Sequence, residues 1–177
     1  MKTKIILLRG VTPAGKNKVP MAPLRSALES AGLENVRTYI QSGNIIASTN
    51  LGQASMEKLV HDVIQKSFGG DITVFARPIA YFKKVLERNP FKSAAQAKLY
   101  FTFLSSRPEA TLLNDFAAIK YTPDNIKAID DVIYIQCATK YSDIRPNNNF
   151  IERKLKVAAT TRVYNTVTKL VDLEANS

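Results

Sequence analysis

The sequence predicts an α+β fold built from two ferredoxin-like units in tandem. Apolar residues at strand and helix spacing follow the order β, α, β, β, α, β over residues 1–77, which is the split βαβ arrangement. The same order recurs over residues 93–163. A composition of 45% hydrophobic and 23% charged residues in 177 is that of a globular protein with a sizeable core. A linking helix at 78–92 and a C-terminal helix with a tail at 164–177 complete the predicted organisation.

The first unit begins with a short apolar strand, which further helices and strands follow. Both faces of this strand are apolar, so we expect both to be buried. Prolines begin the first helix and glycines end both helices, while Ser42 and Gly43 turn a hairpin. The expected elements are a strand at 5–8, a helix from Pro20 to its stop at Gly32, strands at 36–41 and 44–48, a helix at 55–68 and a strand at 72–76.

The second unit follows the linking helix, which begins at Pro78 and stops before Pro90. Two side chains are expected to cap its helices, Ser106 in a capping box with Glu109, and Asn149 with Glu152. The expected elements are a strand at 98–104, a helix after Ser106, strands at 125–129 and 132–137 around Asp130 and Asp131, a helix after Asn149 and a last strand at 160–163.

The net charge of +10 is concentrated at the two ends of the chain. Residues 1–28 carry +6 without an acidic residue, and residues 140–169 carry +5. If the two ends meet in the fold, they form one basic face that attracts nucleic acid or a phosphorylated ligand. A solubilising surface is the plainer interpretation of the same charges.

The loop after the first strand carries the densest set of donors, namely Arg9, Lys16, Asn17 and Lys18. Its glycines and Lys16 match the G-x-x-x-x-G-K core of a phosphate-binding P-loop. Asn17 stands where that motif needs Ser or Thr, and two prolines delay the following helix. A nucleoside triphosphatase is therefore not expected, although the loop can hold an anion.

Two further groups of side chains are candidates for ligand binding. On the hairpin, Tyr39 and Gln41 alternate with Thr38 and Ile40 and can bond a ligand, or they belong to a solvated strand face. Near the C-terminus, Arg162, Asn165 and Lys169 accompany a helix start expected at Thr161 or Asn165. Free N–H groups there suit a phosphate or a carboxylate, although a plain cap explains the threonines equally well.

Catalytic chemistry finds little support in the sequence. The sole histidine, His61, is expected on the polar side of a helix, so neither a catalytic triad nor a multi-histidine metal site is predicted. The single cysteine, Cys137, is expected to be a buried thiol in a reducing cytosol. No metal, cofactor or membrane span is expected, and an enzyme using Lys16 or Tyr39 stays open.

Six motifs carry a family resemblance, namely LLRG, GKNKVPM and VRTYIQSGN in the first third and IERKL, ATTR and NTVTKL in the last. They resemble the bacterial family called domain of unknown function 1697 over nearly the whole chain. The resemblance implies a cytosolic bacterial protein of α+β type with no established activity. The chain departs from the usual family pattern at residues 11–14 and 142–144, and the second departure removes a lysine from the second basic region.

Three hypotheses of function follow. The first is a binding module whose basic surface holds a phosphate-bearing partner, with nucleic acid as the leading example. The second is an enzyme or regulator with a small phosphorylated ligand at the loop from Arg9 to Lys18. The third is a structural or interaction protein in which a second subunit, rather than the other half of the chain or the last helix, covers the free face of the first sheet.

Overall fold

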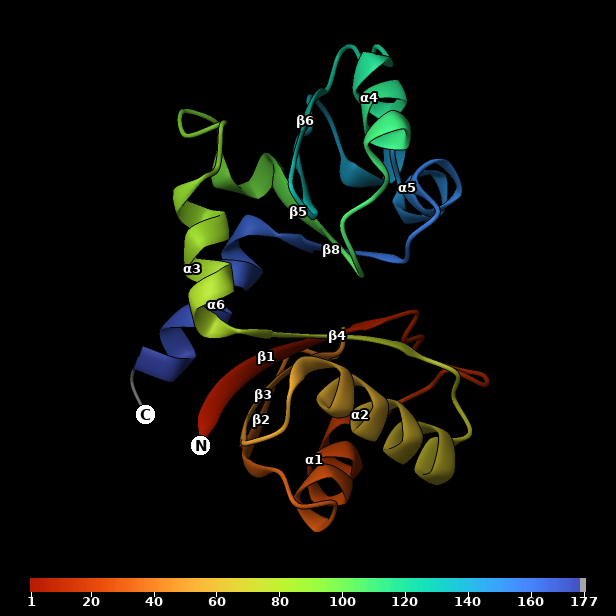
Figure 1. The fold of residues 1–177 in the computed structure, drawn as a ribbon, viewed down its shortest axis with the longest axis vertical. Coiled ribbons are helices and arrows are strands. Elements are labelled where there is room, and N and C mark those ends of the chain that lie inside the picture. The colour runs from red at the N-terminus through yellow and green to blue at the C-terminus, as the bar shows by residue number, and fades with distance from the viewer. Residues whose placement is uncertain (176–177) are drawn as a thin grey trace. The chain divides into compact units, whose positions relative to one another are not determined.

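The structure is a computed structural model that describes residues 1–175; the predicted tail at 176–177 lies outside the described residues. The chain divides into two compact units (Figure 1). Unit 1 comprises Met1–Lys83 with the C-terminal residues from Leu170 onward, and unit 2 comprises Lys84–Lys169. Each unit holds one four-stranded antiparallel sheet with flanking helices, so the predicted pair of ferredoxin-like units is confirmed.

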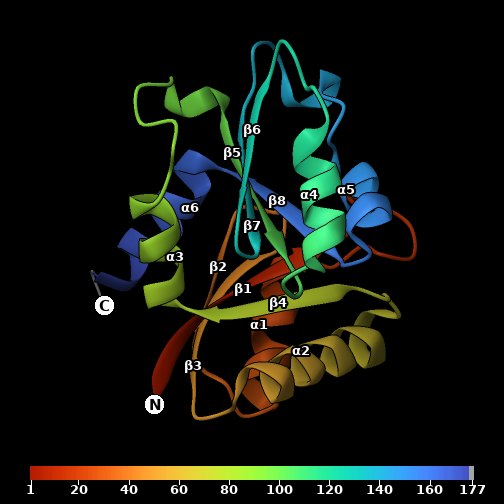
Figure 2. The ribbon, with the colours of Figure 1, turned by 45° about the horizontal axis from the view of Figure 1, so that its top comes forward.

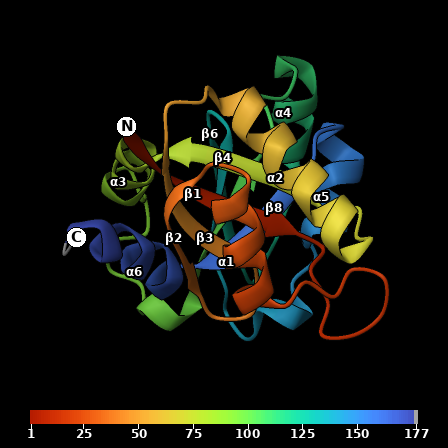
Figure 3. The same cartoon turned by 90° about the horizontal axis from the view of Figure 1, so that it is seen from below.

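Unit 1 has its strands in the order β2-β3-β1-β4, and α1 and α2 cover one face of this sheet (Figure 3). Leu24 and Leu28 of α1 and Val60 and Ile64 of α2 are fully buried in the core between the helices and the sheet. The elements are β1 (Lys2–Arg9), α1 (Met21–Ser30), β2 (Glu34–Tyr39), β3 (Asn44–Thr49), α2 (Gln53–Phe68) and β4 (Thr73–Pro78).

Strand β1 is one of the two inner strands of this sheet. It pairs antiparallel with β3 on one side and with β4 on the other. Ile6 and Leu8 point into the core under α1 and α2, while Ile5 and Leu7, on the alternate face, are also buried. Both faces of the strand are therefore buried, as its continuous apolar run predicts.

Unit 2 repeats the arrangement, with strand order β6-β7-β5-β8 and with α4 and α5 side by side on one face (Figure 2). Its elements are β5 (Leu99–Leu104), α4 (Ala110–Ala118), β6 (Asn125–Ile129), β7 (Val132–Gln136), α5 (Asn148–Leu155) and β8 (Ala159–Val163), with short 3-10 turns at Gln96–Lys98 and Tyr141–Asp143. Helices α3 (Ile79–Glu87) and α6 (Tyr164–Ala175) each run across the division between the units.

Both predicted caps in unit 2 were wrong, and proline explains one of them. Helix α4 begins after Glu109 rather than after Ser106, because Pro108 keeps the residue before it out of the helical conformation. Helix α5 is capped by Asn147, whose Oδ1 accepts a hydrogen bond from the Phe150 amide at 3.0 Å. Glu152 instead accepts a hydrogen bond from the Ala159 amide of β8 at 2.9 Å.

The turn between β2 and β3 is held tightly against the end of β1. The Leu8 amide donates to the Gly43 carbonyl at 2.8 Å. Gly43 has a positive φ of 77°, and a Cβ placed on it would lie 2.7 Å from the Leu8 Cβ, which is closer than packed carbons approach. Only glycine therefore fits at this position without moving a buried strand.

Cys137, which follows β7, is a buried free thiol, as the sequence predicts. Burial raises its pKa to about 11, with Asp124 adding to the rise and Lys98 opposing it. The thiol is therefore protonated throughout the physiological pH range. Among the described residues, no helix is long and apolar enough to cross a membrane.

Replacing Gly43 by Ala should destabilise the protein more than the same change at Gly69. Both glycines have a similar positive φ, 77° and 71°, but Gly69 has open space where a Cβ would stand. The left-handed conformation costs an alanine about 1–2 kcal/mol at either position, and the Leu8 clash adds about 1–3 kcal/mol at Gly43. Urea unfolding of both variants measures the difference, and equal losses would show that the contact with Leu8 is not tight.

Cys137 should be inert toward a thiol reagent in the native protein, because it is both buried and protonated. Ellman's reagent added to folded protein at neutral pH should release almost no chromophore within minutes. The same reagent in concentrated guanidinium chloride should titrate the single thiol completely. Rapid labelling of the native protein would contradict the burial of Cys137.

Candidate functional site

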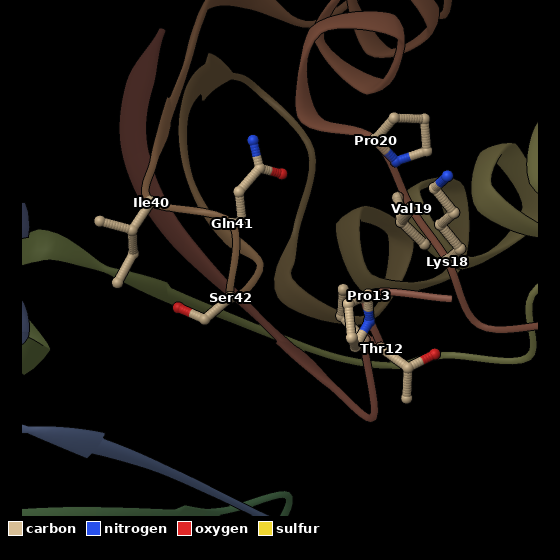
Figure 4. A pocket seen from close by; sticks show the side chains of 9 residues that line it. Thr12, Pro13, Lys18, Val19, Pro20, Ile40, Gln41 and Ser42 are labelled. Carbon is tan, nitrogen blue, oxygen red and sulfur yellow. The ribbon is translucent and has the colours of Figure 1, made fainter. Parts of the chain in front are cut away.

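Unit 1 contains a groove between the loop that follows β1 and the turn that joins β2 to β3. Its volume is about 650 Å³. Thr12, Pro13 and the segment from Lys18 to Pro20 form one side, and Ile40, Gln41 and Ser42 form the other (Figure 4). Val11 completes the lining. Most of the groove wall is therefore apolar, with a few polar groups placed around it.

The turn side of the groove is rigid and carries an unusual residue. The Asn44 Nδ2 donates to the Tyr39 carbonyl at 3.1 Å and to the Ser42 hydroxyl at 2.9 Å, which ties the two ends of the turn together. Ile40 has a φ of 52°, a conformation that a β-branched residue rarely adopts. Its side chain is 52% exposed, so an apolar group is held in a strained conformation at the edge of the groove.

The loop side is shaped by its own hydrogen bonds. The Thr12 amide donates to the Asn17 carbonyl at 3.0 Å, and the Lys18 amide donates to the Gly15 carbonyl at 3.2 Å. The Asn17 Oδ1 also accepts a hydrogen bond from the Asp71 amide at 3.3 Å. These bonds fold the loop back on itself and place Lys18 on the groove wall.

Of the N-terminal residues predicted to bind a ligand, Lys18 and Gln41 line the groove. Lys16 is exposed on the same loop but is not part of the lining, and Asn17 has the structural role just described. Arg9 and Tyr39 are half-buried at the ends of β1 and β2 and do not line the groove either. Of the six predicted residues, two thus line the groove, and Asn17 helps to hold the loop that forms one side of it.

The predicted C-terminal residues lie in unit 2, and one of them is buried. Arg162 is part of β8, and its Nη1 donates to the Thr160 hydroxyl and to the Thr161 carbonyl, each at 2.9 Å. Loss of hydration lowers its pKa to about 10.

Of the two expected helix starts, Thr161 was wrong, because it lies within β8, whereas Asn165 lies one residue from the observed start of α6 at Tyr164. Asn165 and Lys169 are exposed on α6.

The sequence did not reveal the apolar part of the groove, formed by Val11, Pro13, Val19, Pro20 and Ile40. Each is a single apolar residue in a loop, where no periodicity marks it. The one available signal was Ile40, a β-branched residue in a turn that also contains Ser42 and Gly43.

His61 of α2 contacts Asp71, the residue whose amide holds the loop through Asn17. Its Nε2 lies 3.1 Å from an Asp71 Oδ1, and its Nδ1 lies 3.4 Å from an Asp62 Oδ1. The hydrogen bond with Asp71 raises the pKa of His61 above its usual 6.5, and Asp62 adds to the rise against the effect of burial. Asp62 is itself paired with Lys58, which lowers its pKa.

The free energy of unfolding should therefore depend on pH through the protonation of His61. Since its folded pKa is raised, the protonated imidazole stabilises the fold fully below about pH 6.5, and this contribution is lost as the pH rises through the folded pKa. Thermal unfolding between about pH 6 and pH 8 should show a decrease in Tm that the His61→Gln variant lacks. An identical pH dependence in both proteins would contradict the carboxylate contacts.

Comparisons with known proteins identify a family. The family model described as "Protein of unknown function (DUF1697)" matches residues 1–134. A solved structure titled as that of the conserved bacterial protein SP0830 from Streptococcus pneumoniae has a similar fold, with a TM-score of 0.75 and 22% identity, over 96% of this chain and 97% of that one. Comparison with curated proteins gave no significant match. The chain belongs to the DUF1697 family, whose function is unknown.

Proposed function

We propose that the protein is a binding module that holds a small phosphate-bearing ligand in the groove of unit 1. The observation that carries this proposal is the position of Lys18. It is the one charged side chain among the nine residues that line the groove, and it lies two residues before Pro20, the N-cap of α1. The groove thus has a single positively charged residue in an otherwise neutral lining.

The start of α1 adds to the attraction for an anion. The N-terminal end of a helix carries a partial positive charge from its unpaired N–H groups. The first turn of α1 contains no acidic residue, and Pro20 gives it no side-chain cap. A phosphate beside Lys18 and Pro20 would therefore meet an ammonium group and the positive end of a helix together.

The remaining lining residues suit the other part of such a ligand. The volume of about 650 Å³ falls within the range of roughly 300–1,000 Å³ that small-molecule sites occupy. Val11, Pro13, Val19 and Ile40 offer an apolar surface, and Thr12, Gln41 and Ser42 offer groups that orient a ligand by hydrogen bonds. A phosphate monoester with an apolar or aromatic body, such as a nucleoside monophosphate, matches both parts.

Nucleic acid is the other phosphate-bearing partner that the net charge of +10 suggests. Binding to it would be mainly electrostatic and would weaken steeply with salt, whereas a small ligand whose one phosphate contacts Lys18 depends on salt much less. Both the small-ligand proposal and the nucleic-acid alternative include the proposal that the protein is located in the cytosol. Self-association remains a third prediction, which light scattering tests directly.

The test compares ligands and two lysine variants. Inorganic phosphate, nucleoside monophosphates and sugar phosphates are screened by thermal shift, because a ligand at 100 times its Kd stabilises the folded state by about 2.7 kcal/mol. The affinity of the best ligand should fall about tenfold or more in Lys18→Ala, since a charge-assisted bond is lost. Lys16→Ala is the matched control, because Lys16 belongs to the same loop but does not line the groove.

Two outcomes would contradict the proposal. One is the absence of stabilisation by every ligand in the screen. The other is an equal loss of affinity in Lys16→Ala and Lys18→Ala, which would place the anion outside the groove. Labelled RNA and DNA titrated over a range of salt concentrations separate the nucleic-acid alternative, which predicts a steep decrease in affinity.

A further inference from the structure

Four exposed basic side chains lie on or next to α5 in unit 2. Arg145 precedes the helix, Arg153 and Lys154 lie in its last turn, and Lys156 is its C-cap with a φ of 57°. Among the described residues, none of these four takes part in an ion pair. The acidic residue of α5, Glu152, is bonded to the Ala159 amide. The positive charge of this surface is therefore left available to a partner.

Three of these cations lie within cation–π distance of the Phe150 ring. The Arg145 guanidinium carbon lies 5.3 Å from the centre of the Phe150 ring, that of Arg153 lies at 5.6 Å, and the Lys154 ammonium lies at 5.9 Å. The negative face of an aromatic ring attracts a cation, which offsets part of the repulsion between the like charges. The ring thus holds the three positive groups close together.

A groove runs beside this cluster, between α4 and α5, with a volume of about 440 Å³. Leu112, Phe116 and Ile119 form its apolar part, at the spacing i, i+4 and i+7 that places them on one face. Arg153, Lys154 and Lys156 line the groove from the α5 side, and Asp115 lines it from α4. Apolar and positive groups therefore share one opening.

The helix dipole accounts for basic residues at the end of α5, where they face its negative end. It does not account for Leu112 and Ile119, which remain half-exposed next to those charges. Nor does it account for Arg145, which lies before the helix begins. The combination is that of a recognition surface with an apolar centre and a charged rim.

From this arrangement we infer that the groove between α4 and α5 binds an acidic amphipathic peptide segment of a protein partner. One or two apolar side chains of the peptide fill the space over Leu112 and Ile119. Glutamate or aspartate residues beside them pair with Arg153, Lys154 and Lys156. Helical peptides present anchors at i and i+4 in this way when they bind in a groove.

Nucleic acid fits this surface less well than a peptide does. Binding of single strands relies on exposed aromatic rings for stacking, but Phe150 is only 8% exposed and Phe116 is 1% exposed. Asp115 would repel a phosphate beside it, as it would repel a glutamate of the peptide, but a nucleic-acid backbone carries a phosphate at every nucleotide. A peptide can instead place a backbone N–H group or a basic side chain opposite Asp115.

Fluorescence anisotropy with the full-length protein tests the inference. The probe is a labelled helical peptide of about 14 residues with two leucines at i and i+4 among glutamates. One matched peptide replaces the leucines by serine, and another replaces the glutamates by glutamine. The probe should bind saturably, and each matched peptide should bind at least about tenfold more weakly, since each lacks one of the two required features.

Variants locate the site on the protein. The Arg153→Glu/Lys154→Glu double variant should weaken binding of the probe about tenfold or more. The matched control is Lys2→Glu/Lys66→Glu, which makes the same charge change at two exposed residues of unit 1, with Lys66 likewise in the last turn of a helix. Lys156→Glu alone provides a second test if the double variant fails to fold.

Several results would overturn the inference. They are the absence of binding at low salt, equal binding of the serine-substituted peptide, and equal losses in the control variant. Tighter binding of a labelled oligouridylate that competes with the probe would assign the surface to nucleic acid instead. All of these readouts concern unit 2 and are independent of whether a ligand occupies the groove of unit 1.

Discussion

The close approach of Leu8 to Gly43 is the constraint on which the groove of unit 1 depends. It fixes the turn between β2 and β3 against the last residues of β1, through one backbone hydrogen bond and a contact too tight for any side chain at Gly43. The loop that forms the other wall begins directly after β1. Both walls of the groove are therefore positioned by β1, and the hydrogen bond from the Asp71 amide to Asn17 also holds the loop.

A groove built in this way is preorganised, and preorganisation lowers the entropic cost of binding. The strained conformation of Ile40 fits the same account. A β-branched residue with a φ of 52° costs free energy, of the order of 1–3 kcal/mol, and it persists because the bonds of Asn44 define the turn around it. The side chain that carries this strain is one of the few large apolar groups left exposed among the described residues, and it lines the groove.

Periodicity and turn residues were enough to predict the fold, because each strand and helix in both units has its own apolar pattern. The caps could not be placed as well, since three consecutive asparagines precede Phe150 and any of them is a good cap. At the site, Lys18 and Gln41 were predicted from their chemistry. The apolar lining was not, because single apolar residues in loops carry no pattern. The burial of Arg162 was also hidden, since one arginine in the strand sequence ATTRV gives no indication of which face is covered.

The central claim is that an anion binds between Lys18 and the β2–β3 turn, and an NMR titration tests it most directly. Adenosine monophosphate is added to ¹⁵N-labelled protein while the amide shifts are followed. The account predicts saturable shifts centred on residues 11–20 and 40–43, which Lys18→Ala weakens and Lys16→Ala leaves nearly unchanged. Shifts that fail to saturate, or that spread over basic residues elsewhere while these amides stay unchanged, would contradict it.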